Sequence, residues 1–223
     1  MKAILFGATG MVGRAVLREC LLDPGMDRVL AVGRSPSGQR HDKLRDLVLK
    51  DFADLAAVDA DLAGYDACFY CLGVTSAGMS EADYTRVTYD LTMAAATPLA
   101  RVNPDMTFVY VSGAGTDSSE KGGSMWARVK GKTENALLAL PFKGRFMFRP
   151  GFIQPMHGIQ SKTSSYRILY RLMTPFSPIL RMLFPSVATT TERIGRAMLK
   201  VARDGAPKNI LETSDINQLG GDR

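Results

Sequence analysis

The stretch FGATGMVGRA, residues 6–15, places three glycines within seven positions directly after an apolar run at residues 3–6. That run has the character of a buried strand, and residues 11–22 carry apolar side chains at helical spacing until Asp23-Pro24-Gly25. In such a strand–turn–helix unit, one glycine permits the tight turn, one lets the backbone approach a pyrophosphate, and one lets helix and strand pack closely. The N–H groups that open the helix then face the phosphates. The residues predicted to contact a dinucleotide here are Gly7, Ala8, Thr9, Gly10, Met11, Val12 and Gly13.

The rest of the chain repeats this alternation of short β-rich runs with helical periodicity. Repeated alternation means right-handed crossovers and a parallel sheet. We therefore expect an α/β fold, a Rossmann-like doubly wound parallel sheet of strand order 3-2-1-4-5-6. The expected strands span residues 3–6, 28–33, 46–49, 67–72, 107–112 and 145–148. A single domain is expected over residues 1–223, with a small C-terminal helical lobe in which residues 151–203 cover the substrate.

Capping-box spacing marks two further helix starts, Ser80 with Asp83 and Thr189 with Glu192. The first helix is expected to place three side chains on one face, those of Tyr84, Val87 and Leu91. The second helix is expected to bury an apolar face formed by Ile194, Ala197, Met198 and Val201.

The net charge of +6 is concentrated in one late segment. Residues 1–150 carry 18 Lys and Arg against 17 Asp and Glu, whereas residues 151–203 carry eight Lys and Arg against Glu192 alone. This basic segment has no recognition-helix motif, zinc ligands or aromatic-rich RNA-binding signature. The sequence therefore predicts no nucleic-acid partner.

The cysteines bear on the cellular compartment of the protein, and the apolar runs bear on whether it crosses a membrane. Three cysteines, Cys20, Cys68 and Cys71, form no even disulfide framework, and the chain begins with a strand rather than a secretory segment. We therefore expect a cytoplasmic location. No uncharged apolar run reaches the roughly 18 residues of a membrane span. The most apolar region is interrupted by Arg167, Arg171 and Arg181.

The end of the second expected strand bears on nucleotide preference. An NAD-selective site usually places Asp or Glu there to hold the ribose 2′-hydroxyl, but this chain has Arg34-Ser35. A guanidinium can bind the 2′-phosphate of NADP through charge-assisted bonds worth about 1.5 to 3 kcal/mol, or roughly 10- to 150-fold in affinity. NADP (NADPH) is therefore favoured over NAD. The alternative is a solvated arginine at a strand end.

Several short motifs, in order and spacing, resemble the atypical, epimerase-like short-chain dehydrogenase/reductase family, in particular its small Tat-interacting-protein-like branch. The motifs are the turn of Gly7, Gly10 and Gly13, then Asp51-Phe52, Cys71-Leu72-Gly73, Ser112, Lys130 and Arg149-Pro150-Gly151. The resemblance covers almost the whole chain. It implies an adenine contact near Asp51, a wall beside the nicotinamide at Leu72-Gly73, and a carboxamide contact near Pro150-Gly151.

The resemblance fails at one position of the reaction centre. The family places a catalytic tyrosine four residues before the lysine, whereas this chain has Trp126 four residues before Lys130. An indole N–H donates a hydrogen bond but exchanges no proton near neutral pH, and a positioned general acid contributes typically 10²- to 10⁴-fold. Lys130 is still expected to hold ribose hydroxyls and Ser112 to orient a substrate. Their alternatives are a surface lysine and a helix-capping serine.

Two classes of function remain open from the sequence. The first is an NADP-dependent oxidoreductase or epimerase-like enzyme whose proton source is not identified, although Tyr166 or Tyr170 could replace the missing acid. The second is a non-catalytic NADPH-binding sensor or regulator that acts through a partner. Sugar-nucleotide epimerisation is less favoured, because 223 residues leave room for a small substrate lobe only.

No metal site is predicted. Cys68 and Cys71 have CxxC spacing, but residues i and i+3 of a strand point to opposite faces, so both are interpreted as buried small hydrophobes. The two histidines, His41 and His157, lie apart from any cysteine or carboxylate cluster in the sequence.

The basic late segment combines arginines with apolar residues. This composition suits a small-molecule substrate with an anionic head and an apolar body, and it equally suits a membrane surface or a partner. The alternative is that apolar residues pack on the sheet while the long arginine stems reach water. The sequence predicts no oligomeric state.

Overall fold

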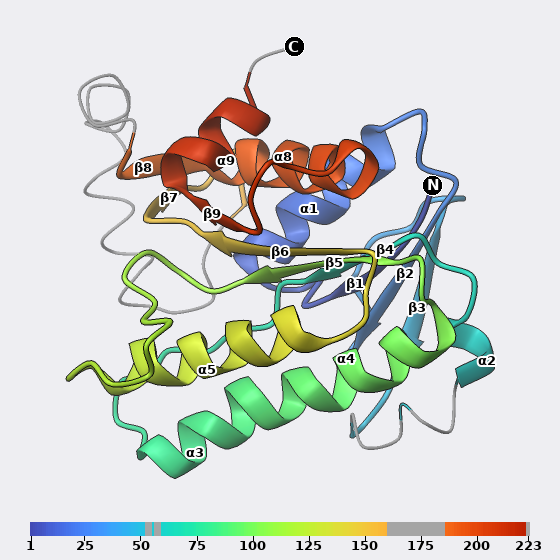
Figure 1. Cartoon of the computed structure of the whole chain (residues 1–223). Coiled ribbons are helices and arrows are strands. Elements are labelled where there is room, and N and C mark those ends of the chain that lie inside the picture. The colour runs from blue at the N-terminus through green and yellow to red at the C-terminus, as the bar shows by residue number, and fades with distance from the viewer. Residues whose placement is uncertain (52–54, 56–58, 160–185, 222–223) are drawn as a thin grey trace.

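A computed structural model describes residues 1–51, 55, 59–159 and 186–221 of the chain. Its central feature is a seven-stranded sheet of order β3-β2-β1-β4-β5-β6-β9, in which every pairing is parallel (Figure 1). The predicted order is confirmed, and β9 extends it by one strand. The seven strands are β1 (Lys2–Phe6), β2 (Arg28–Gly33), β3 (Leu44–Val48), β4 (Ala67–Tyr70), β5 (Thr107–Val111), β6 (Gly144–Arg149) and β9 (Ile210–Glu212).

Helices cover both faces of this sheet, as expected for a doubly wound fold. In Figure 1, α1, α8 and α9 lie over one face, while α3, α4 and α5 lie over the other. The helices of the described residues are α1 (Met11–Leu22), α2 (Asp59–Leu62), α3 (Glu81–Thr85), the π-helix η2 (Arg86–Asp90), α4 (Leu91–Val102), α5 (Met125–Ala139), α8 (Thr191–Asp204) and α9 (Thr213–Leu219).

Each face of the sheet has its own apolar core. The core under α1 and α8 includes Val16 and Met198, and the core under α4 and α5 includes Leu99 and Leu137. Because the central strands contact both cores, they are apolar almost throughout rather than alternating. The predicted buried face of α8 is confirmed, since each of its four residues is at most 1% exposed: Ile194, Ala197, Met198 and Val201.

Five of the six predicted strands begin or end at other residues than predicted, and two of them, β1 and β6, differ only by being one residue longer at one or both ends. The third strand is Leu44–Val48 rather than residues 46–49, because the edge strand pairs with β2 in the register Val29↔Leu44. An edge strand tolerates polar residues, so the apolar pattern predicted the wrong first residue for β3. β4 and β5 end at Tyr70 and Val111, earlier than predicted. The residues after these ends are therefore in loops at the carboxyl edge of the sheet.

Three short strands escaped prediction. β9 extends the main sheet, while β7 (Phe152–Gln154) and β8 (Ala188–Thr190) pair in parallel as a separate two-stranded sheet. Strands of three residues form because of pairing and burial rather than because of local β propensity. The expected covering segment is described at residues 151–159 and 186–203, and Tyr166 and Tyr170 lie outside the described residues.

The helix that begins after Ser80 differs from its prediction in one respect. Ser80 does cap α3, accepting a hydrogen bond from the N–H of Asp83 at 3.1 Å. The π-helix η2 then adds a residue per turn, which rotates the following side chains. Tyr84 is consequently buried in the protein, whereas Val87 and Leu91 line a cavity. The expected shared face of these three residues stays a prediction, and the π-helix between them is the feature that the sequence did not indicate.

The start of α8 is shifted by one residue from the predicted cap. Thr190, not Thr189, accepts a hydrogen bond from the N–H of Arg193, at 3.0 Å. The Thr189 hydroxyl is buried and has no hydrogen-bond partner in the described part of the chain.

This arrangement predicts opposite effects for two neighbouring substitutions in β8. Thr190→Val removes a helix cap and is expected to cost about 1 kcal/mol, lowering Tm by about 2–4 °C. Thr189→Val keeps the shape and removes an unpaired buried hydroxyl, so Tm is expected to stay or rise. Thermal unfolding of both variants by circular dichroism measures the difference. A larger loss in Thr189→Val would contradict the assigned cap.

Candidate functional site

The glycine turn follows β1 and leads directly into α1. The N–H of Gly10 donates to the carbonyl oxygen of Gly7 at 2.9 Å, and Gly7 has φ +82°, which favours glycine. A Cβ on Gly7 would lie 2.8 Å from the backbone of Cys71, and one on Gly13 would lie 2.0 Å from the Gly7 oxygen. Side chains are therefore excluded at Gly7 and Gly13, where the turn touches the end of β4 and the first turn of α1.

The start of α1 is arranged for an anion. Its N-cap is Gly10, no side chain caps the helix, and no acidic residue lies in its first turn. The first N–H groups of a helix have no partner within the helix, and the helix dipole favours negative charge there. The N–H groups of Met11, Val12 and Gly13 thus suit the pyrophosphate of a dinucleotide.

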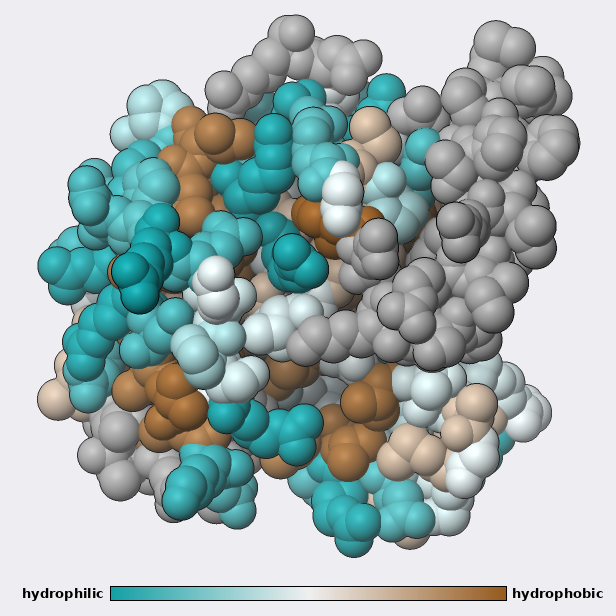
Figure 2. Space-filling view, turned by 180° about the vertical axis from the view of Figure 1, so that it is seen from behind, coloured by the Kyte–Doolittle hydropathy of each residue, from teal (hydrophilic) through white to brown (hydrophobic). Residues whose placement is uncertain are grey.

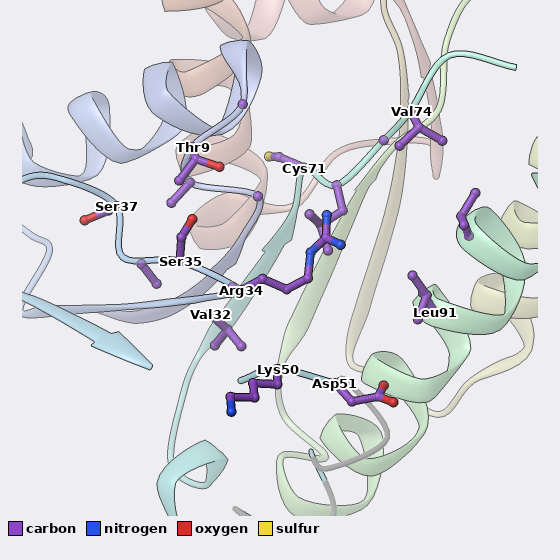
Figure 3. A pocket seen from close by; sticks show the side chains of 18 residues that line it. Thr9, Val32, Arg34, Ser35, Ser37, Lys50, Asp51, Cys71, Val74 and Leu91 are labelled. Carbon is purple, nitrogen blue, oxygen red and sulfur yellow. The ribbon is translucent and has the colours of Figure 1, made fainter. Parts of the chain in front are cut away.

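A cavity of about 560 Å³ lies beside this turn, at the carboxyl ends of β1, β2, β3 and β4 (Figure 3). Ligands of open α/β sheets bind at this edge. The structure brings together in this cavity ten of the residues predicted from the sequence: Gly7, Ala8, Thr9, Gly10, Arg34, Ser35, Asp51, Cys71, Leu72 and Gly73. Sequence reasoning missed the other residues of its lining: Ala31, Val32, Gly33, Ser37, Lys50, Val74, Val87 and Leu91. Phe52 lies outside the described residues.

Two cations line this cavity from neighbouring strand ends. Arg34 follows β2 and Lys50 follows β3, and Figure 3 shows their charged ends pointing in different directions. Neither forms an ion pair with the residues that the structure describes. Ser37 is fixed nearby, because its N–H and hydroxyl donate to the Asp46 carboxylate at 3.0 and 3.1 Å. The signal for Lys50 was present in the sequence, where it directly precedes Asp51.

A second group of predicted residues lies at the ends of β5 and β6. The Lys130 ammonium donates a hydrogen bond to the carbonyl oxygen of Ser112. Burial lowers the pKa of Lys130 to about 8, and the Glu134 carboxylate opposes that shift. The Trp126 ring lies against Gly115, where an added Cβ would be 3.5 Å from the indole. Ser112, Trp126 and Lys130 lie at the loop that follows β5, and none of them lines the cavity beside the glycine turn.

The Ser112 hydroxyl makes its hydrogen bonds within the protein. It donates to Glu134 Oε1 at 2.5 Å and lies 3.1 Å from the carbonyl oxygen of Phe148. Glu134 is fully buried, and the Arg149 guanidinium donates to both of its oxygens. Ser112, Glu134 and Arg149 therefore form one polar network. Lys130 contacts this network through the carbonyl oxygen of Ser112.

Pro150 and Gly151 lie beside the same loop. The Pro150 carbonyl oxygen accepts from the N–H of Ala114 at 2.9 Å, and the N–H of Gly151 donates to Thr213 Oγ1 at 2.8 Å. A Cβ on Gly151 would lie 2.3 Å from the Val187 oxygen. The structure thus places this dipeptide next to the loop that follows β5, and the carboxamide contact stays a prediction.

The cysteines pack as strand alternation predicts. Cys68 belongs to the core under α4 and α5, whereas Cys71 contacts the core under α1 and α8. Burial raises the pKa of both thiols, which makes their thiolates scarce at neutral pH. No group of three or more metal-ligating side chains is found in the described part of the chain. His157 instead contacts Glu192, with 3.0 Å between Nε2 and Oε2.

The surface shows separate apolar patches among hydrophilic residues on the face turned away in Figure 1 (Figure 2). Among the residues that the structure describes, the large apolar side chains that are at least half exposed are Leu22, Val48, Val74 and Val187. None of the helices that the structure describes is both long and apolar enough to cross a bilayer.

Comparison with known proteins agrees with this geometry. The profile of a family described as NAD(P)H-binding matches residues 7–138. The mitochondrial protein FMP52-2 of Scheffersomyces stipitis is 28% identical over 231 residues, covering 97% of this chain and 96% of its own. The protein HTATIP2 of Rattus norvegicus is 28% identical over 155 residues, covering 69% of this chain and 62% of its own. These relatives confirm the resemblance to the Tat-interacting-protein-like branch.

Solved structures show the same fold at low sequence identity. The Bordetella bronchiseptica enzyme WbmF, in complex with NAD⁺, has a TM-score of 0.66 and 16% identity, covering 97% of this chain and 77% of that one. A short-chain dehydrogenase family protein of Francisella tularensis has a TM-score of 0.65 and 14% identity, covering 92% of this chain and 91% of that one. The Rossmann-like fold class is therefore confirmed.

The relatives contradict the expected cytoplasmic location. FMP52 proteins from Scheffersomyces stipitis, Debaryomyces hansenii, Aspergillus oryzae and Emericella nidulans are named mitochondrial. These names point to a mitochondrial rather than a cytoplasmic location. The cysteine pattern could not have made this distinction, because it indicates reduced thiols and not the compartment that keeps them reduced.

Proposed function

This chain belongs to the NAD(P)H-binding family, and from that premise we propose that its nucleotide is NADPH rather than NADH. The observation that carries the proposal is the pair of cations in the cavity, Arg34 and Lys50, neither with an acidic partner among the described residues. The carboxylate that usually holds a free ribose 2′-hydroxyl is replaced by Arg34 at the end of β2. A 2′-phosphate would supply the missing negative charge.

The proposed arrangement of the dinucleotide follows the edge of the sheet. Its pyrophosphate lies on the N–H groups of residues 10–13, and its adenine lies near Asp51. The Lys130 ammonium, beside the end of β5, holds the hydroxyls of the nicotinamide ribose. Leu72-Gly73 follow β4 and Pro150-Gly151 follow β6, so the two dipeptides flank the nicotinamide from the strands on either side of β5.

The proposed reaction is the reduction of a small carbonyl compound. When bound, NADPH would supply a hydride to the carbonyl carbon, and solvent water would supply the proton that the resulting alkoxide takes up. Lys130 adds positive charge where negative charge develops on the carbonyl oxygen, and this favours the transition state. The substrate class suggested by the basic late segment is an anionic head with an apolar body, and that segment would cover the substrate within the single domain.

A second candidate function is favoured by Trp126. The indole occupies the position of the expected proton donor and cannot exchange a proton near neutral pH. This observation supports a non-catalytic NADPH-binding protein that senses the nucleotide or regulates a partner. The two candidates share the nucleotide and differ in whether it turns over.

Affinity measurements test the nucleotide. Arg34→Ala is expected to weaken NADPH binding by about 10- to 150-fold and Lys50→Ala by about tenfold, with NADH affinity unchanged. The chain has one tryptophan, Trp126, at the proposed site, so energy transfer from it to the reduced nicotinamide reports binding directly. Calorimetry provides an independent dissociation constant.

The matched control is Arg40→Ala, which removes the same charge from an exposed residue that does not line the cavity. It is expected to bind NADPH like the unaltered protein. If Arg34→Ala and Lys50→Ala leave the ratio of NADPH to NADH affinity unchanged, the assignment of NADPH is wrong.

A further inference from the structure

Glu134 is a fully buried carboxylate close to the proposed nucleotide site. It lies on α5 one helical turn after Lys130 and is 0% exposed. Removing a carboxylate from water is costly unless charges and hydrogen bonds compensate it. Here Ser112 donates to one oxygen at 2.5 Å, and Arg149 Nε lies 3.1 and 3.2 Å from the two oxygens. These donors all suit the ionised carboxylate.

Lys130 depends on charges in its neighbourhood, because it is partly buried. Its ammonium donates to the Ser112 carbonyl oxygen, and Glu134 is the carboxylate that favours its charged form. Other side chains around α5 have partners of their own: Glu81 of α3 pairs with Arg128, the Tyr89 ring of η2 lies under Lys132, and Arg149 of β6 pairs with Glu134 and Glu212. Among the described residues, Lys130 thus relies on Glu134 for a counter-charge.

We propose that Glu134 is a positioning residue that acts through Lys130: it holds the lysine in its charged form at the nicotinamide ribose, while Arg149 and Ser112 hold Glu134 in place. This inference rests on the proposed binding of NADPH. A purely structural Glu134, which only ties β6 to α5 through Arg149, would affect stability and leave the pH dependence of binding unchanged.

The sign of the expected pH dependence follows from the charge on Lys130. Burial lowers the pKa of Lys130 to about 8, so the ammonium is present below pH 8 and is lost as pH rises. NADPH affinity should therefore be constant up to about pH 8 and fall above it, by about tenfold per pH unit at most, since one proton is involved. Loss of the Glu134 charge lowers the Lys130 pKa further, so the break should move to lower pH.

The experiment compares Glu134→Gln with the unaltered protein, using NADPH as the probe. Its dissociation constant is measured between pH 6 and pH 10 by energy transfer from Trp126 and by calorimetry. The break in Glu134→Gln is expected at least about one pH unit lower. Glu134→Asp, which restores the charge, is expected to bring the break back toward pH 8. The matched control is Glu81→Gln, which removes a carboxylate that contacts Arg128 on the same helix and is expected to keep the break near pH 8.

Lys130→Arg keeps its charge throughout this range and is expected to remove the break. This variant tests the inference even if Glu134→Gln does not fold. A break that persists in Lys130→Arg, or one that stays at the same pH in a folded Glu134→Gln, overturns the role of Glu134. Failure of the unaltered protein to bind NADPH at pH 7 is a different result, which overturns the proposed function itself.

Discussion

Replacement of Trp126 by tyrosine is expected to raise the rate of NADPH-dependent carbonyl reduction by about 10²- to 10⁴-fold, the usual contribution of a positioned general acid. Residues 126 and 130 lie on the same side of α5, one turn apart. A phenol at position 126 would therefore lie near the Lys130 ammonium, whose positive charge lowers the pKa of the phenol and eases proton release. The ring is also smaller than the indole that now lies against Gly115.

The measurement is NADPH oxidation at 340 nm with a panel of aldehydes, ketones and quinones. Trp126→Phe is the matched control, because it has the ring of tyrosine without the hydroxyl and is expected to show no gain. Activity in Trp126→Tyr alone would support the non-catalytic function for the natural chain. Turnover in the unaltered protein that does not respond to either substitution would indicate another proton donor, and no gain in Trp126→Tyr would contradict the placement of residue 126 at a reaction centre.

Gly13→Ala is expected to destabilise the protein by at least about 3 kcal/mol, at the upper end of the range for overpacking, and to abolish NADPH binding. The added Cβ would lie 2.0 Å from the Gly7 oxygen and 2.6 Å from the Gly7 carbonyl carbon, and neither can move without opening the turn. Since that turn also contacts Cys71 at the end of β4, the strain is expected to spread into the sheet.

Thermal unfolding should show a fall in Tm of about 6–12 °C for Gly13→Ala. Gly123→Ala is the control, because a Cβ at Gly123 has no atom within 4 Å. It is expected to unfold close to the temperature of the unaltered protein. A Gly13→Ala variant with unchanged Tm would show that the turn tolerates a side chain and would remove the reason given for that glycine.

The central sheet was predictable because its strands are buried on both faces and read as apolar runs. The same rule failed for β3, where a polar edge strand begins at Leu44, and for β9, which exists through its pairing with β6. Helix α8 was predicted with its buried face, but its cap was placed at Thr189, since Thr189 and Thr190 offer the same hydroxyl to a sequence pattern.

The residues of the cavity beside the glycine turn were easier to predict from the sequence than the polar network of Ser112, Glu134 and Arg149. Glycine spacing and the residue after β2 predict a dinucleotide site, and ten of the predicted residues do line one cavity. Lys50 was missed although it directly precedes the predicted Asp51, because its position relative to Arg34 depends on how β3 aligns with β2. Glu134 was missed because four positions beyond Lys130 a glutamate on a helix is ordinarily a solvated residue, and only the packing of β6 against α5 shows that it is buried.

Strand β9 also protects the sheet against pairing with strands of other molecules. β9 occupies the outer edge of β6, whose inner residues Phe146, Met147 and Phe148 are nearly inaccessible to water. Without residues 210–212, the backbone of this apolar strand would be left as an open template for strands of other molecules. A chain shortened before Ile210 is therefore expected to aggregate more readily than the full chain, because β9 covers the edge of β6 as well as completing the sheet.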